Sequence, residues 1–321
     1  MPTRRHLVAL AAAAAAFAAA GGLVPGRGEN KTQAPTHART RAVATFSILG
    51  DLVRKVGGER LDLATLVGPN GDVHVYAPTP ADAKAIAAAD IVFVNGLGLE
   101  GWVDRLIAAS GTHAAIVVAS QGVKPRGGAT GRDRAETDPH AWQSVANAEI
   151  YVGNIRDALI AADPASEDVY RANATSYLAA LEMLDAEIKT AIEAVPVARR
   201  KVITTHTAFG YFGDAYGIEF IAPEGLSTDA DPSARDIARL IEQIRREKIP
   251  AVFIENVTDP RLLQRIAAET GARIGGTLYS DALSAPDGPA ATYIDMMRSN
   301  VRELTKGWRA DAELIARLTL A

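Results

Sequence analysis

The chain has 321 residues, of which 48% are apolar and 22% charged, and this composition is typical of a globular protein long enough for two domains with a cleft between them. Its formal net charge of −4 gives no electrostatic reason to bind nucleic acid, because phosphate neutralisation requires clustered Lys and Arg. The absence of cysteine excludes disulfides, thiolate metal sites and cysteine nucleophiles, so any bound metal must use His, Asp or Glu.

The N-terminus predicts export. Two arginines precede an uncharged apolar run, residues 7–20, which is shorter than a membrane span of about 20 residues and ends in small residues. We therefore expect a cleaved signal peptide at residues 1–20, read by either general secretion or twin-arginine export, and a flexible linker at residues 21–40. The expected location is periplasmic, with no membrane span in the mature form. Because there is no cysteine to acylate, we expect that the protein is not a lipoprotein.

An N-terminal lobe is predicted at residues 41–163. Short β-branched runs alternate there with helical patterns, and this spacing favours a parallel sheet with helical crossovers. The predicted strands are residues 43–47, 61–67, 91–95 and 115–119, and the predicted helices are residues 49–56, 80–89 and 100–109.

A long connecting helix is predicted at residues 164–195, where apolar residues recur at helical spacing over a length of roughly 45 Å. The alternative is a pair of helices meeting near Ala179. A C-terminal lobe at residues 196–321 then repeats the strand and helix alternation, so the predicted fold is α/β with two roughly four-stranded lobes. Its predicted strands are residues 202–205, 219–222, 251–255 and 274–278, and its predicted helices are residues 208–216, 233–247, 260–269 and 289–305.

Three of the six histidines, together with one aspartate, lie beyond a predicted strand or in the loop expected at that end of a lobe. Ligands of open α/β sheets bind outside the carboxyl ends of the strands, so these side chains could meet in the interlobe cleft. His74 and His140 precede the long helix, and His206 and Asp281 follow it, which gives two candidates from each lobe. From the residues alone, a metal site and four ordinary loop residues remain open alternatives.

Four motifs carry a resemblance to a known family. They read Ala-Thr-Phe-Ser-Ile-Leu-Gly-Asp at 44–51, Gly-Asp-Val-His at 71–74, Asp-Pro-His-Ala-Trp at 138–142 and His-Thr-Ala-Phe-Gly-Tyr-Phe at 206–212. In this order they resemble the metal-binding solute-binding proteins of ABC importers, the ZnuA-like and TroA-like cluster, and are most similar to its AztC-type zinc members. The resemblance runs from about residue 41 to the C-terminus.

The resemblance implies a fold of two lobes joined by a rigid helix, with limited hinge opening on metal release. It implies that His74, His140, His206 and Asp281 are the metal ligands. The implied function is to capture Zn²⁺ with high affinity and deliver it to a membrane permease driven by an ATPase. We expect a monomer and no enzymatic activity, and a periplasmic metallochaperone is a further candidate partner.

The ligand chemistry favours zinc as the cargo. Three imidazoles and one carboxylate suit four-coordinate Zn²⁺, whereas manganese members of the family look more oxygen-rich, with a carboxylate where this chain has His206. Manganese or iron is the alternative cargo. Protons compete for the imidazoles, so we expect metal affinity to fall as the pH drops through about 6.5.

Residues around the predicted ligands add further expectations. Glu255 ends a predicted strand and could orient an imidazole, and Trp142 and Phe209 could shield the metal or simply belong to the core. Zinc members often carry a histidine-rich loop, but residues 122–138 contain no histidine before the Asp-Pro-His motif. This loop could gate the cleft, contact a partner or be inert.

Two other classes of protein compete with a transport role. A catalytic zinc site keeps an open position beside three protein ligands, whereas four protein ligands close it. The chain also lacks the His-Glu-x-x-His and Gly-x-Ser-x-Gly motifs of zinc and serine hydrolases. An exported adhesin would need no tight interlobe metal site, and reversible metal binding would distinguish it from a transport protein.

Overall fold

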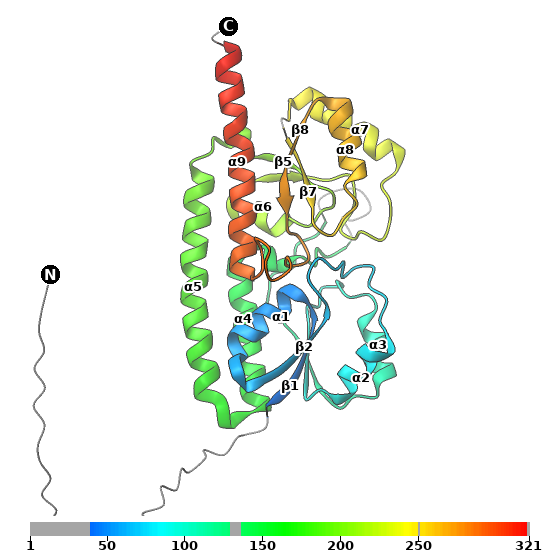
Figure 1. Cartoon of the computed structure of the whole chain (residues 1–321), viewed down its shortest axis with the longest axis vertical. Helices are drawn as coiled ribbons and strands as arrows, with labels where there is room; N and C mark the ends of the chain where they lie inside the picture. The colour runs from blue at the N-terminus through cyan, green and yellow to red at the C-terminus, as the bar shows by residue number, and fades with distance from the viewer. Residues whose placement is uncertain (1–38, 129–135, 250, 320–321) are drawn as a thin grey trace, which may run out of the picture. The chain divides into compact units, whose positions relative to one another are not determined.

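Two parallel sheets of four strands form the framework of the chain (Figure 1). The computed structural model describes residues 39–128, 136–249 and 251–319. The predicted signal peptide and nearly all of the predicted linker therefore lie outside the described residues. The first sheet has the strand order β2-β1-β3-β4 and the second has the equivalent order β6-β5-β7-β8, so the two lobes share one topology. The predicted α/β fold with two parallel-sheet lobes is confirmed.

The N-terminal lobe consists of the first sheet and the helices that cover it. Its central strand β3 has the sequence Ile-Val-Phe-Val and is buried along its whole length, as expected for a parallel strand covered on both faces. The strands are β1 (Thr40–Phe46), β2 (Leu61–Val67), β3 (Ile91–Val94) and β4 (Ala115–Val118). The helices are α1 (Ser47–Gly57), α2 (Pro80–Ala88), α3 (Val103–Ser110) and α4 (Val145–Ala162).

The C-terminal lobe consists of the second sheet with three shorter helices. Helix α7 begins where the Ser233 side chain accepts a hydrogen bond from the Asp236 amide, an N-cap that the sequence encodes locally. The strands are β5 (Lys201–Ile203), β6 (Glu219–Ile221), β7 (Ala251–Glu255) and β8 (Arg273–Leu278). The helices are α6 (Gly210–Tyr216), α7 (Ala234–Glu247) and α8 (Arg261–Thr270).

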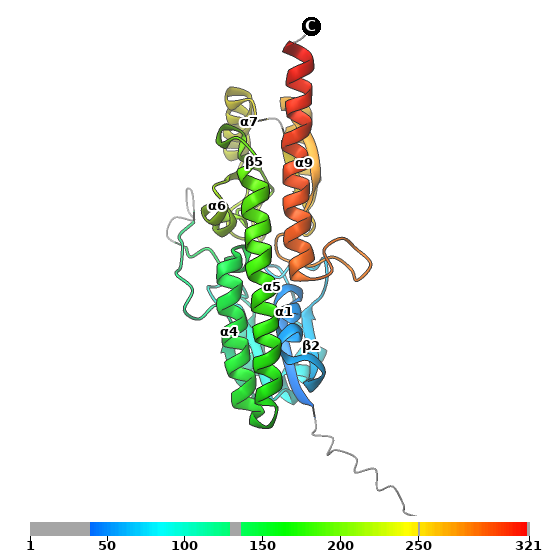
Figure 2. The ribbon, with the colours of Figure 1, turned by 90° about the vertical axis from the view of Figure 1, so that its left-hand side faces the viewer.

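Two long helices, α5 (Glu167–Glu193) and α9 (Tyr293–Thr319), lie side by side, as Figures 1 and 2 show from two directions. An ion pair joins them, because Arg298 Nε and Nη2 donate to the carboxylate of Glu187 at 2.8 and 2.9 Å. Helix α5 is one continuous helix rather than a pair, and its buried residues follow one stripe. Helix α9 begins against the N-terminal lobe, where the Tyr293 amide donates to Asp51, and then packs along β8.

Helix α4 is the main element that the sequence analysis missed. Its buried residues Val145, Ala148, Val152 and Leu159 recur at helical spacing, so the periodic pattern was present. Helix α9 is also longer than the predicted helix at residues 289–305. Neither difference changes the fold.

One large apolar core extends from the N-terminal sheet through α4, α5 and α9 to α6 and strands β7 and β8. A second, smaller core lies among β5, β7, α7 and α8. The two lobes are therefore joined by shared packing as well as by the chain. Among the helices in the described part of the chain, none has the length and apolarity that crossing a membrane requires.

Candidate metal centre

The structure brings all four predicted metal ligands together. His74 lies in the loop after β2, His140 precedes the short 3-10 helix Ala141–Gln143, and His206 and Asp281 follow β5 and β8. Each residue offers one ligand atom, and these four atoms lie within 4.8 Å of one another. We call this group the histidine–aspartate cluster.

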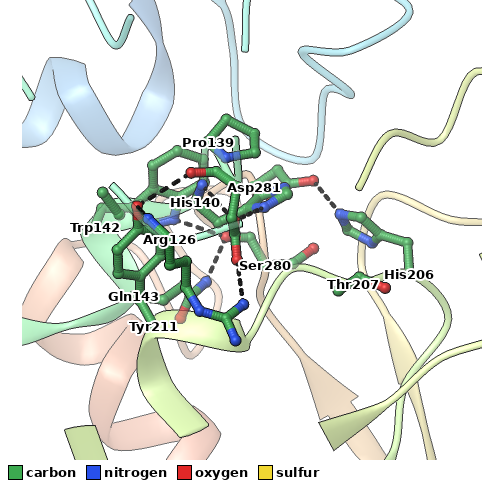
Figure 3. A network of polar contacts seen from close by, with 12 residues as sticks. Arg126, Pro139, His140, Trp142, Gln143, His206, Thr207, Tyr211, Ser280 and Asp281 are labelled. Carbon is green, nitrogen blue, oxygen red and sulfur yellow. Dashed lines mark hydrogen bonds and ion pairs between the residues drawn. The ribbon is translucent and has the colours of Figure 1, made fainter. Parts of the chain in front are cut away.

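Within the histidine–aspartate cluster, the Nε2 atoms of the three histidines face the carboxylate of Asp281. Figure 3 shows His140, His206 and Asp281 of this group. His206 Nε2 lies 3.0 Å from Oδ2, and the Nε2 atoms of His74 and His140 lie 3.5 Å from Oδ2 and Oδ1 respectively. The Nε2 atoms of His74 and His140 are 3.2 Å apart. The His74 side chain is 4% exposed and the other three are fully buried.

The closest of these separations, 3.0 to 3.5 Å, match the ligand spacing around a small tetrahedral ion. Bonds of about 2.1 Å in a tetrahedral zinc site place the ligand atoms about 3.4 Å apart. Both carboxylate oxygens of Asp281 and both ring nitrogens of His206 are buried without a hydrogen bond of good geometry in the described chain. Buried polar atoms of this kind are costly unless they have a partner, and a shared cation would supply one to His206 Nε2 and to the carboxylate of Asp281, while Glu255 lies at His206 Nδ1.

Carboxylates behind the histidines hold two of the rings. Asp138 Oδ1 lies 2.8 Å from His140 Nδ1, and Glu255 Oε2 lies 2.7 Å from His206 Nδ1. A carboxylate at Nδ1 favours the tautomer that leaves the Nε2 lone pair free for a metal. The second oxygen of Glu255 accepts the amides of Thr205 and His206 at 2.8 and 3.0 Å, so Glu255 also fixes the backbone.

Charge pairing within the histidine–aspartate cluster outweighs the effect of burial on two pKa values. Burial by itself would raise the pKa of Asp281, but His206, His140 and His74 outweigh it and hold this pKa well below the usual range. Burial would likewise lower the pKa of His206, but the carboxylates of Glu255 and Asp281 raise it well above the usual value. The metal-free cluster therefore favours a protonated His206 beside an ionised Asp281.

Asp281 follows a C-terminal strand, yet its neighbours are bonded to the N-terminal lobe. The carbonyl of Ser280 accepts the indole N–H of Trp142 at 3.0 Å and the amide N–H of Gln143 at 2.7 Å. The amide of Leu283 donates to Ser47 Oγ at 3.0 Å. Asn256, which follows β7, also donates its side-chain amide to the Ala282 carbonyl at 3.2 Å, so the segment that carries Asp281 is bonded to both lobes, whereas Glu255 holds His206 on the C-terminal lobe.

The remaining predicted residues divide between the site and the core. Trp142 contacts the His140 ring edge-on, with centroids 5.4 Å apart, while its indole holds the Ser280 carbonyl. Phe209 stacks on Phe220 with centroids 5.0 Å apart and belongs to the core. In the loop at residues 122–138, Gly127 and Thr137 form an antiparallel bridge, and residues 129–135 lie outside the described residues.

Several residues around the site were not singled out from the sequence. The carboxylates of Asp72 and Asp138 accept the amides of His74 and His140 at 2.9 and 3.0 Å, each two residues further along the chain. The repeated Asp-x-His spacing is a local pattern that could have identified both, because aspartate often accepts the backbone amide two residues ahead. No local pattern points to Arg126, which lies against Asp138 only in the folded chain.

Comparison with known proteins places these findings in a family context. Residues 42–307 match the family model described as zinc-uptake complex component A, periplasmic (ZnuA). The chain is 34% identical over 268 residues to the manganese-binding lipoprotein MntA of Halalkalibacterium halodurans, covering 83% of this chain and 88% of that protein. It is 32% identical over 273 residues to the iron-binding protein YfeA of Yersinia pestis, covering 85% and 88%.

The fold is also shared with solved structures. The periplasmic zinc-binding protein TroA of Treponema pallidum superposes with a TM-score of 0.80 at 28% identity, covering 84% of this chain and 99% of that one. The similarity therefore includes proteins named for manganese, iron and zinc.

The expected location without a lipid anchor is contradicted by these comparisons. The MntA relative, and streptococcal relatives named PsaA and MtsA, are named as lipoproteins. The expectation rested on the absence of cysteine from the printed sequence. Relatives of this similarity include named lipoproteins, so that absence was not a sound basis for the prediction.

Proposed function

The chain belongs to the ZnuA and TroA family of metal-binding substrate-binding proteins of ABC transporters, and we propose that its cargo is Zn²⁺. Members of this family are not enzymes, and their partners are a permease and its ATPase. In our proposal the four residues of the histidine–aspartate cluster bind the ion directly, and the protein delivers it to the permease.

The observation that carries this proposal is the convergence of three Nε2 atoms on one carboxylate. Ligand atoms of the cluster lie 3.0 to 3.5 Å apart in the closest pairs, which supports a tetrahedral ion. Mn²⁺ prefers a more oxygen-rich and higher-coordinate set of ligands, and Zn²⁺ exceeds Mn²⁺ and Fe²⁺ in intrinsic affinity for imidazole.

The names of the relatives favour a second candidate cargo. MntA and YfeA are named for manganese and iron, so a cargo of Mn²⁺ or Fe²⁺ is the alternative within the same family. The distinguishing feature is His206, because a third imidazole favours zinc over manganese. A monomer suffices for either cargo, since one chain supplies all four candidate ligands. The expected metallochaperone stays a prediction.

The experiment is to measure metal content in the purified protein and then titrate the metal-free form with Zn²⁺ and Mn²⁺ in competition. We expect one tightly bound zinc per chain and a strong preference for zinc. The variant His206→Asp should lose zinc affinity and narrow that preference, because it replaces an imidazole with a carboxylate. The matched control is His113→Asp, at an exposed histidine in the turn before β4.

Two results would contradict the proposal. Binding of Mn²⁺ as tightly as Zn²⁺ by the unchanged protein would assign the cargo to the alternative. Unchanged zinc affinity in His206→Asp would remove His206 from the ligands.

A further inference from the structure

The position of His206 within the histidine–aspartate cluster differs from that of its three neighbours. His74 and His140 lie on the N-terminal lobe and the segment around Asp281 is bonded to both lobes, whereas Glu255 at the end of β7 holds the ring and backbone amide of His206 on the C-terminal lobe. A separation of the lobes would therefore move His206 away from His74 and His140. Contacts that hold the His206 side of the cleft against the N-terminal lobe should then control metal release.

One such contact is built around Arg126, which lies in the loop after β4. Its Nη1 atom donates to Asp138 Oδ2 at 2.8 Å, and the other oxygen of Asp138 holds the His140 ring. Its Nε atom donates across the lobes to Asp214 Oδ2 at 2.9 Å, and Asp214 lies on α6. The Arg126 side chain is 21% exposed and Asp138 is fully buried, so water weakens the pair with Asp138 less than the pair with the exposed Asp214.

The same helix makes two more bonds across the cleft. The backbone amide of Arg126 donates to the Tyr211 hydroxyl at 3.1 Å, and that hydroxyl donates to the Asp138 carbonyl at 3.3 Å. Figure 3 shows Arg126 and Tyr211 close to His140. Helix α6 begins four residues after His206, so these bonds act on the segment that carries this histidine.

The close contact between Arg126 and helix α6 requires a glycine, and Gly210 supplies it. A Cβ atom at Gly210 would collide with the guanidinium of Arg126 and with the carboxylate of Asp138. Glycine at the first position of α6 therefore lets the charged pair pack directly against the helix.

From this geometry we propose that Arg126, Tyr211 and Asp214 form an interlobe latch that slows metal release by holding the His206 side of the cleft closed. Arg126 is a positioning residue in this proposal, since it reaches the candidate ligand His140 only through Asp138. The proposal rests on the proposed function, because a latch on metal release presupposes that the cluster binds a metal.

The test compares variants that cut the latch in different ways. The double variant Tyr211→Phe/Asp214→Asn removes the two hydrogen bonds of the Tyr211 hydroxyl and the negative charge of residue 214, and it keeps the Arg126–Asp138 pair. Arg126→Gln removes the charged pairs with both Asp138 and Asp214 and leaves the Tyr211 bonds, which use backbone atoms of residues 126 and 138. Each protein is loaded with Zn²⁺, and the rate of zinc transfer to an excess of a chromogenic chelator is measured by stopped-flow absorbance.

We expect the double variant to release zinc at least about tenfold faster than the unchanged protein, and Arg126→Gln, which keeps the Tyr211 bonds, also to release it faster than the unchanged protein. Arg126→Lys should restore slow release only partly, because an ammonium cannot form the same fork to two carboxylates. The control Arg298→Gln, which cuts the charged pair between α5 and α9, should release zinc at the original rate.

Equal melting temperatures of the metal-free proteins would show that the faster release does not reflect a damaged fold. If the double variant does not fold, Asp214→Asn alone tests the latch. That position is 67% exposed, and we expect an increase of about two- to threefold there.

If the double variant released zinc at the rate of the unchanged protein, the latch proposal would be wrong. If Arg126→Gln alone were fast, Arg126 would act through Asp138 within one lobe, and the latch would again be wrong. Failure of the unchanged protein to take up zinc would instead contradict the proposed function, so the two failures are distinguishable.

Discussion

Carboxylates support the candidate ligands at the residue scale. Asp138 and Glu255 lie at 2.8 and 2.7 Å from the Nδ1 atoms of His140 and His206. Such partners set the tautomer and orientation of an imidazole and increase its strength as a ligand. The strength of metal binding should therefore depend on residues that do not touch the metal.

The first prediction concerns Glu255. The variant Glu255→Gln should bind zinc about 10 to 100 times more weakly, because the His206 ring loses its charged partner. Competition titration against a chelator of known affinity measures the change. The control Glu247→Gln removes a carboxylate that pairs with Lys201 far from the cluster, and it should bind zinc normally. Unchanged zinc affinity in Glu255→Gln would show that Glu255 only accepts the backbone amides of Thr205 and His206 and does not support the His206 ring as a ligand.

A second prediction concerns pH. The pKa of His206 is raised in the folded metal-free protein, so the folded state keeps a proton that the unfolded state loses near pH 6.5. This contribution to stability is fully present below pH 6.5 and is lost as the pH rises through the raised pKa. Asp281, whose pKa is lowered, contributes stability above about pH 3.8 that is lost in stronger acid.

Melting temperatures of the metal-free protein should therefore fall as the pH rises above neutral, whereas zinc affinity should increase because fewer protons compete for the imidazoles. Thermal unfolding and zinc titration over the same pH series measure both trends. His206→Gln should reduce the alkaline loss of stability. Zinc affinity that does not change with pH would argue against imidazole ligands.

At the scale of elements, α5 is defined by its periodic burial. Leu181, Leu184, Ile188 and Ile192 are buried on one stripe, while Met183 is 61% exposed on the other side. The stripe faces α1, α4 and α9, so one helix contributes to the packing of many elements. Its sequence pattern was sufficient to predict a helix, and packing against these neighbours keeps it unbroken.

The third prediction follows from this pattern. Leu184→Ala should lower the free energy of unfolding by about 2 to 5 kcal/mol, because it leaves a cavity in the shared core. Met183→Ala is the matched control and should change it by less than about 0.5 kcal/mol. Chemical denaturation of the metal-free proteins measures both. Equal effects of the two substitutions would be inconsistent with the burial pattern.

At the scale of the whole described chain, the lobes are coupled by one apolar core. Residues of the N-terminal sheet, α5, α6 and α9 belong to the same buried cluster. Separate unfolding of either lobe would expose part of this cluster to water. The lobes should therefore unfold together, and movement between them should be small compared with that of lobes joined only by a linker.

The fourth prediction tests this coupling by calorimetry. The metal-free protein should unfold in a single transition, and zinc should raise the midpoint temperature of that transition. An ion that binds only the folded state, present at 1,000 times its dissociation constant, adds about 4 kcal/mol to the free energy of unfolding. His74→Ala should keep the single transition and lose most of the zinc-dependent shift. Two separate transitions in the metal-free protein would show that the lobes are independent.

The sequence by itself determined the elements and the candidate residues of the site. Strands such as β3 and the stripe of α5 are encoded in local hydrophobic patterns, and the positions of His74, His140, His206 and Asp281 after strands follow from the same patterns. Parallel sheets place such positions at one edge, so local information was enough to bring these residues into one hypothesis.

Only the tertiary structure decided how the site is held. The bonds from Trp142 and Gln143 to Ser280 join residues more than 130 positions apart, and the reach of Arg126 to Asp214 spans 88 positions. No local pattern encodes such pairs, because they depend on how two lobes and the long helices pack together. The attachment of Asp281 to the N-terminal lobe, and the separate support of His206, therefore became visible only in the folded chain.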